Sequence, residues 1–216
     1  MNEPLETTPV VLKKYALVDY VFQFITITAG VLIALLINGL VEWKHNRELV
    51  AQARTMIARE VADNVKELEG LPETVKKSNA DIENGLNLAN DLLAKGKSAI
   101  HSVNLGFNLP SLSSTSWQTA QQTGALAHME YDEAQKYSGL YYRQAMFDVQ
   151  QTKAIDLVAS ASMLMAGSFE PDRADPQDVR RFREQLMLLQ ANLLVTQQLS
   201  DQLMKAYRDF LQTKSN

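Results

Sequence analysis

Apolar residues recur at helical spacing along most of the chain, and one segment is apolar on every side. From Tyr20 to Val41 no charged residue occurs across 22 positions. At about 1.5 Å per residue, a helix of this length measures roughly 33 Å, close to the ~30 Å hydrocarbon core of a bilayer. Tyr15 and Trp43 flank the segment, where amphipathic rings favour a membrane interface. The pattern predicts a transmembrane helix over residues 20–41, preceded by a short tail over residues 1–19.

Two other interpretations of this segment remain open. A cleaved signal peptide also begins with basic residues, here Lys13 and Lys14, but its apolar region is usually about 7–15 residues long and ends at small residues. The run here is longer, and the sequence Ile37-Asn38-Gly39 is a poor cleavage site. A soluble core helix of this length normally carries a continuous polar stripe. Because only isolated polar residues interrupt the run, a membrane anchor is favoured.

The orientation of the anchor depends on the basic residues beside it. Lys13 and Lys14 precede the apolar run and favour a cytoplasmic N-terminus. The basic residues after the run favour the opposite orientation, and they are Lys44, Arg47, Arg54 and Arg59. We expect the C-terminal domain in the periplasm of a bacterium, with the anchor crossing the inner membrane once.

One face of the predicted membrane helix carries small and polar residues. At 100° per residue, five of them fall on about a third of the circumference: Gln23, Thr26, Gly30, Ala34 and Asn38. Small residues four apart let two helices approach closely, and amide side chains can form hydrogen bonds across the contact. This face is the predicted helix–helix interface, although glycine, alanine and threonine are also common in membrane helices without one.

Helical periodicity continues beyond Trp43 and predicts a helical bundle domain over residues 42–213, with a tail over 214–216. A first segment ends at Gly70, a second runs from Pro72 to Gly96, a third from Glu130 to Ala166, and the last from Pro176 to Thr213. The candidate core residues are, in chain order, Val50, Ile57, Val61, Val65, Leu68, Val75, Ile82, Leu86, Ala89, Leu93, Tyr131, Ala134, Tyr137, Tyr141, Ile155, Val158, Met163, Val179, Phe182, Leu186, Leu189, Leu193, Leu199, Leu203, Tyr207 and Phe210.

The stretches between these helices predict the connections. Residues 97–113 form an irregular loop, and a short helix over Ser116–Thr123 follows, with Thr115 and Gln118 as its capping box and Gly124 as its end. Nothing alternates with period two for long enough to require a sheet. The expected fold is all-α: one transmembrane helix that continues into an antiparallel bundle of long helices with coiled-coil-like packing.

Composition excludes several classes of chemistry. The chain has no cysteine and a net charge of −4, which removes thiol chemistry and argues against nucleic-acid binding. Its three histidines, His45, His101 and His128, are scattered and form no metal-ligand motif. No phosphate-binding glycine loop or nucleophilic-serine motif is present. We therefore expect no cofactor, no metal and no enzymatic activity.

Aromatic and amide residues are concentrated in residues 114–144. The candidate pocket residues in this region are Trp117, Gln121, Tyr131, Tyr137 and Tyr141. The alternative is an aromatic core cluster where the short helix docks on the bundle, and the sequence favours that alternative.

Two segments carry a resemblance. The anchor "ITAGVLIALLINGLVEWKHNREL", with Gly30 to Asn38 as its central motif, and the segment "STSWQTAQQTGAL" resemble a group of uncharacterised bacterial single-pass membrane proteins. The likeness covers about a fifth of the chain and implies no activity and no functional residue.

These features predict a non-enzymatic bitopic membrane protein. We expect it to act as a subunit or scaffold of an inner-membrane assembly, in contact with the bilayer and with a second copy or another membrane subunit. The alternative is a membrane-anchored helical sensor domain that binds a small molecule or a peptide.

Overall fold

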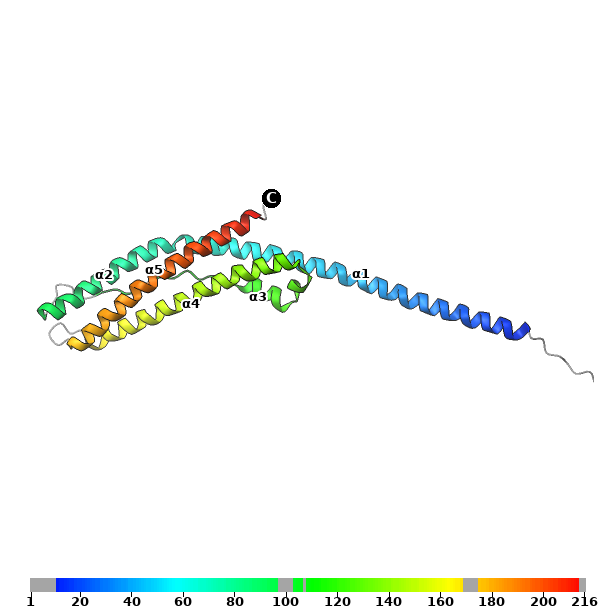
Figure 1. The fold of residues 1–216 in the computed structure, drawn as a ribbon, viewed down its shortest axis with the longest axis horizontal. Helices are drawn as coiled ribbons and strands as arrows, with labels where there is room; N and C mark the ends of the chain where they lie inside the picture. The colour runs from blue at the N-terminus through cyan, green and yellow to red at the C-terminus, as the bar shows by residue number, and fades with distance from the viewer. Residues whose placement is uncertain (1–10, 97–102, 107, 169–174, 214–216) are drawn as a thin grey trace, which may run out of the picture. The chain divides into compact units, whose positions relative to one another are not determined.

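The computed structural model describes residues 11–96, 103–106, 108–168 and 175–213, with the side chains of residues 11–16, 167 and 168 left out. It divides into two compact units, residues 1–49 and 50–216. Five α-helices and one 3₁₀-helix make up the described regular structure: α1 (Val11–Glu69), α2 (Leu71–Lys95), α3 (Thr115–Gln122), η1 (Ala125–His128), α4 (Tyr131–Ser168) and α5 (Pro176–Thr213) (Figure 1). The fold is all-α, as the sequence predicts.

Helix α1 is unbroken for 59 residues and contributes to both units. Its continuity past Val41 is expected, because no glycine or proline lies between Val41 and Leu49. Its last turns, from Val50 to Glu69, belong to the second unit and pack there. The first unit contains the remainder of the helix, including the predicted membrane segment.

The step from α1 to α2 differs from a helical hairpin. Gly70 has φ −79° and ψ −14°, which is right-handed helical geometry, and Thr74 donates its N–H to the Gly70 carbonyl over 3.3 Å. The chain therefore continues in the same direction instead of reversing, and α2 extends the part of α1 that lies in the second unit (Figure 1). Pro72 occupies the first turn of α2, where its missing N–H has no intrahelical partner to lose.

Contacts along the helices give their directions within the second unit. Arg54 pairs with Glu133, and Glu60 accepts a hydrogen bond from Tyr141, so α1 and α4 run in parallel. Asn64 meets Tyr207 near the end of α5, whereas Asn90 meets Arg183 near its start. Helix α5 therefore runs antiparallel to the combined α1–α2 arm and to α4, and the bundle has three helical members.

The fourth member of the bundle is not a helix. Residues 103–106 and 108–113, which we call the strap, connect the end of α2 with α3 without forming a helix or a strand. Val103 lies against Gly85 of α2, and Ser113 lies against Asn64 of α1. These two helix positions are about 32 Å apart at 1.5 Å per residue, and the chain covers that distance in the ten steps from Val103 to Ser113. At about 3.2 Å per residue the strap is nearly fully extended.

Burial follows the predicted helical stripes with specific exceptions. Most candidate core residues of α1, α2 and α5 are buried, and Phe182, Leu186, Leu203 and Tyr207 are fully so. On α4, Tyr137 and Tyr141 are buried as predicted, but Tyr131, Ile155 and Met163 are exposed, and so is Leu93 on α2. These four predictions are wrong. The buried face of α4 passes instead through Gln144, Phe147, Gln151, Ala154 and Ala161.

Candidate functional site

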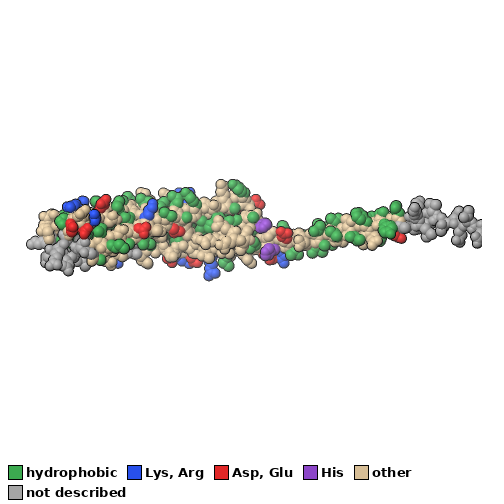
Figure 2. Space-filling model, turned by 90° about the horizontal axis from the view of Figure 1, so that it is seen from below, with side chains coloured by type: hydrophobic (Ala, Val, Ile, Leu, Met, Phe, Trp, Pro, Cys, Tyr) green, Lys and Arg blue, Asp and Glu red, His purple; other side chains and the backbone are tan. Residues whose placement is uncertain are grey.

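The apolar segment of α1 belongs to the first unit, and among the described residues of that unit nothing packs against it. The large hydrophobic side chains from Tyr20 to Val41 are 51–72% exposed. Hydrophobic side chains are visible along the length of this helix in Figure 2. By length and composition, this is the one helix among the described residues that can cross a membrane, and a signal sequence would pass the same test. Such exposure in water is costly at about 25 cal/mol per Å² of apolar surface.

The five predicted interface residues all lie on this exposed segment. Thr26 uses its hydroxyl within the helix, donating to the Phe22 carbonyl over 2.9 Å, so it does not introduce an unpaired donor into an apolar surface. Apart from its chain neighbours and the backbone of its own helix, no described atom lies within 4 Å of the place where a side chain on Gly30 would begin. Gln23, Ala34 and Asn38 are likewise exposed. The interface on this face stays a prediction.

In the second unit, polar side chains hold the strap to the helices. Asn64 of α1 accepts the N–H of Ser113 over 2.8 Å and donates to its carbonyl over 2.8 Å. Gln144 of α4 donates to the same carbonyl, and Gln151 donates to the carbonyl of Pro110. An extended segment without a neighbouring strand has unpaired backbone groups, and burial of these groups is costly unless side chains bond them. This requirement explains why amides occupy the buried face of α4.

Glu60 joins the strap, α3 and α4. Its carboxylate accepts hydrogen bonds from the Tyr141 hydroxyl at 2.6 Å, from the Ser113 hydroxyl at 2.8 Å and from the Ser116 backbone N–H at 2.8 Å. The last bond caps the N-terminus of α3, where a negative charge is stabilising. Burial, reinforced by the hydrogen bond to Glu60, raises the pKa of Tyr141 well above its ordinary value, so this hydroxyl remains a donor.

The capping box predicted for α3 is therefore wrong. The N-cap is Ser114, one residue earlier than expected, and Gln118 donates to the Ser114 hydroxyl oxygen over 2.9 Å instead of bonding back to Thr115. The cap comes from Glu60, which is 56 residues distant from Ser116 along the chain. Local sequence spacing cannot reveal a cap of this kind.

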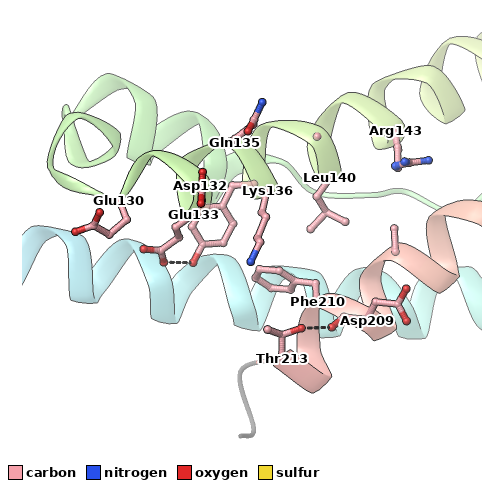
Figure 3. Close-up of a pocket in the computed structure, with 13 residues that line it drawn as sticks. Glu130, Asp132, Glu133, Gln135, Lys136, Leu140, Arg143, Asp209, Phe210 and Thr213 are labelled. Atoms are coloured by element: carbon pink, nitrogen blue, oxygen red, sulfur yellow. Dashed lines mark hydrogen bonds between the residues drawn. The ribbon is translucent and has the colours of Figure 1, made fainter.

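A groove of about 640 Å³ lies between the first turns of α4 and the last turns of α5 (Figure 3). Tyr137, Leu140 and Phe210 supply its apolar surface, and the rings of Tyr137 and Phe210 meet edge to face with centroids 5.5 Å apart. Charges of both signs surround this surface, from Glu130, Asp132, Glu133, Lys136, Arg143 and Asp209. We call this the α4–α5 groove.

One edge of the α4–α5 groove is fixed by ionic contacts. Arg54 donates to both carboxylate oxygens of Glu133, at 2.7 Å for its Nε, and Tyr137 donates to the same carboxylate over 2.9 Å. The hydrogen bonds that Arg54 donates to Glu133 raise the pKa of Arg54. Burial is the largest cause that raises the pKa of Tyr137, and the hydrogen bond that its hydroxyl donates to Glu133 is the second. Glu133 is thus neutralised within the protein, and the remaining groove charges are mixed in sign.

A smaller pocket of about 370 Å³ lies between α3 and α4. We call it the aromatic pocket, and its lining residues are Ser114, Trp117, Gln118, Gln121, Ser138, Tyr141, Tyr142, Gln144, Ala145 and Asp148. Trp117 and Tyr141 are stacked, with ring centroids 5.2 Å apart and planes inclined by 8°. Asp148 is half-buried in it, and burial raises the pKa of its carboxyl group.

The structure separates the five predicted pocket residues into three groups. Trp117, Gln121 and Tyr141 together line the aromatic pocket, whereas Tyr137 lines the α4–α5 groove. Tyr131 is 78% exposed and lines neither. Sequence reasoning did not single out Asp148, which follows the buried Phe147 and has no motif around it. It also missed Glu60 and Asn64, although polar residues at core positions of α1 are a signal that a partner must be present.

Metal binding finds no support in the described part of the chain, where no cluster of three or more histidine and acidic residues lies close enough to hold an ion. His45 and His128 are exposed, and His101 lies outside the described residues.

No protein-family model, curated protein or solved structure matches the chain. The resemblance carried by the anchor and by the segment around Trp117 therefore stays a prediction.

Proposed function

We propose that the protein is a bitopic protein of a bacterial inner membrane, anchored by residues 20–41 of α1. The observation that carries this proposal is the exposure of 22 consecutive uncharged residues on a helix of membrane-spanning length. A bilayer would cover this surface. Trp43 at its end supports the assignment, since Arg47 lies 4.8 Å from the centre of its ring and the pair combines an aromatic and a cationic interfacial residue.

Carbonate extraction of membranes tests the anchor. We expect the full-length protein to stay in the membrane pellet, and intact mass measurement to show that residues 20–41 remain attached. A mature protein that lacks this segment and washes off with carbonate would show that the segment is a cleaved signal sequence.

We propose further that the helical domain acts by contact with other proteins, as a non-enzymatic subunit or scaffold. Support comes from α5, in which residues 185–200 contain no charged residue. Met187, Leu188, Leu194 and Val195 are all exposed there although the opposite face of the helix is fully buried. An apolar surface of this kind on a folded domain is typical of protein interaction sites. The expected partner is a second copy or another subunit of the membrane assembly.

Paired variants test the contact function. Leu194→Gln should leave the helical content unchanged and weaken recovery of partners that co-purify in mild detergent. Met163→Gln, on α4, replaces an apolar residue that is even more exposed than Leu194 and does not belong to the α5 surface, and it serves as the control. Equal recovery with both variants would remove the α5 surface from the proposal.

The C-terminal domain is proposed to lie in the periplasm. Lys13 and Lys14 before the anchor support this orientation, and the basic residues after it oppose it. A periplasm-dependent reporter fused after Asn216 should be active. Activity of a cytoplasm-dependent reporter alone would reverse the orientation.

A second function is favoured by the aromatic pocket, which is large enough for a small ligand. In this alternative the helical domain is a membrane-anchored sensor. A ligand retained through purification would distinguish it from a scaffold, which is expected to retain a stoichiometric protein partner.

A further inference from the structure

The aromatic pocket has a uniform sign of charge, in contrast to the α4–α5 groove. Asp148 is its single ionisable carboxylate, and no lysine, arginine or histidine is among its lining residues. The Asp148 carboxylate has no hydrogen bond or ion pair with the described residues. Glu60 lies behind the wall formed by Tyr141 and adds a second negative charge nearby. The pocket therefore has an uncompensated negative charge.

Aromatic rings form the walls beside this carboxylate. Trp117 and Tyr141 stack on each other, and Tyr142 is 68% exposed at the pocket edge. The faces of such rings attract cations, with about 0.5–2 kcal/mol per contact depending on how far the cation is desolvated. Rings and a carboxylate together favour a positively charged group over a neutral one.

The remaining lining groups offer hydrogen-bond acceptors. Gln118 has its amide N–H₂ engaged with Ser114, which leaves its carbonyl oxygen as an acceptor. Gln121 and Ser138 provide further oxygen atoms at the surface of the pocket. A ligand that carries N–H donors uses these oxygens, whereas a quaternary ammonium ion cannot.

We propose that the aromatic pocket binds a small organic cation with N–H donors, that is, a primary ammonium or guanidinium group. Asp148 neutralises the charge, the rings of Trp117 and Tyr142 flank the cation, and Gln118 and Gln121 accept its hydrogen bonds. The volume of about 370 Å³ limits the ligand to a small molecule or to the head group of a larger one. This inference rests on the second function, in which the domain is a ligand sensor.

The test uses the full-length protein in an uncharged detergent, with agmatine as the probe because it carries both cationic groups. Trp43→Phe leaves Trp117 as the only tryptophan, so its fluorescence reports on the pocket. We expect a saturable change with agmatine, a weaker one with tetramethylammonium, which lacks N–H donors, and none with the neutral 1,4-butanediol. Calorimetry on the unaltered protein should give the same dissociation constant.

Variants of two aspartates on α4 identify the carboxylate. Asp148→Asn should raise the dissociation constant for agmatine about tenfold or more, as expected when a charged hydrogen-bond partner is removed. Asp156→Asn, eight residues further along and outside the pocket, should have no effect. Tyr142→Ala removes an exposed ring without disturbing the core and should weaken binding several-fold. Circular dichroism establishes that each variant is folded.

Three results would overturn the proposal: no saturable change at millimolar agmatine, equal binding of 1,4-butanediol, or unchanged affinity in a folded Asp148→Asn protein. Mixed micelles that contain phosphatidylethanolamine separate the two sources of an ammonium group. Competition by the lipid assigns the pocket to a head group, and lack of competition assigns it to a free amine. The result of carbonate extraction does not depend on this pocket. A failure to bind agmatine would therefore leave the proposed membrane anchor unaffected.

Discussion

Two helical glycines have opposite surroundings, and substitutions there should have opposite effects. Gly85 lies in the buried face of α2, where an added Cβ would come within 2.7 Å of the Leu186 Cδ1 atom. Gly139 lies in α4, and apart from its chain neighbours and the local helix backbone no described atom lies within 4 Å of that position. A methyl group therefore meets a packed core at Gly85 and open space at Gly139.

Gly85→Ala should lower the free energy of unfolding by about 1–2 kcal/mol, since overpacking costs about 1–3 kcal/mol and alanine returns up to about 1 kcal/mol of helix propensity. Leu186 is fully buried and has little room to move. Gly139→Ala should raise the same quantity by about 0.5–1 kcal/mol. Urea unfolding of the detergent-solubilised protein measures both, and a change of the same sign in the two variants would contradict this assignment.

Glu60 is expected to be more important for stability than other glutamates of α1. Glu60→Gln removes the charge that accepts three hydrogen bonds from α3, α4 and the strap, and a charge-assisted bond is worth about 1.5–3 kcal/mol. The thermal midpoint should fall by several degrees. Glu67→Gln changes an exposed glutamate of the same helix and should leave the midpoint unchanged. Similar behaviour of the two variants would show that the cap on α3 contributes little.

At the scale of elements, the sequence predicts α5 and α2 well and α4 poorly. Apolar residues at every third or fourth position of α5 meet apolar partners, so periodicity alone locates the buried face. The inward face of α4 carries Gln144 and Gln151, because it meets the backbone of the strap and must bond its carbonyl groups. A prediction from apolar periodicity leaves out these buried amides. It assigns the exposed Ile155 and Met163 to the core instead.

The strap and the aromatic pocket also could not be predicted from apolar periodicity, because both depend on contacts between residues that are distant along the chain. Loop residues show no period, and the partners of Ser113 come from α1 and α4, 49 and 31 residues away. Trp117, Gln121 and Tyr141, which line the aromatic pocket, could be grouped from the sequence because they are close along the chain. Asp148 becomes part of it only when α3 packs on α4.

The exposed face of α1 leads to a prediction about association in the membrane. Gly30→Leu places a large side chain on the small-residue face and should weaken helix–helix association by about 1–2 kcal/mol, or roughly fivefold to thirtyfold. Leu32→Ile on the opposite face conserves volume and should have no effect. A membrane association assay and co-purification with partner proteins measure the two variants. Unchanged association in every assay would show that the small-residue face is ordinary membrane-helix composition.

At the scale of the whole molecule, three buried tyrosines should make stability depend on alkaline pH. Burial is the largest cause that raises the pKa of Tyr137, Tyr141 and Tyr207. The folded state therefore holds the phenolic protons more tightly than the unfolded state, whose tyrosines titrate near pH ~10. The contribution of these tyrosines to the free energy of unfolding is fully present below pH ~10 and is lost as the pH rises above that value.

The slope should approach about 1.4 kcal/mol per pH unit for each buried tyrosine. Urea unfolding between pH 8 and pH 11 measures it. Tyr207→Phe loses the hydrogen bond to Gln144 and should be less stable at pH 8. Its stability should nevertheless fall by about a third less per pH unit, because one of the three groups no longer titrates. An identical slope in the variant would assign the alkaline loss to other groups.

The nearly full extension of the strap gives the α1–α2 arm a mechanical property. The strap is attached beside Asn64 and Gly85, on either side of the joint at Gly70. Ten residues reach at most about 33–36 Å, and the attachments are about 32 Å apart, so the slack is only a few ångströms. The strap is thus close to its maximum length where it runs beside the α1–α2 arm. We expect that bending of the arm at Gly70 towards the strap would shorten the distance that the strap must cover. Bending away from the strap would lengthen that distance past the reach of an extended chain, so the arm should bend in one direction only.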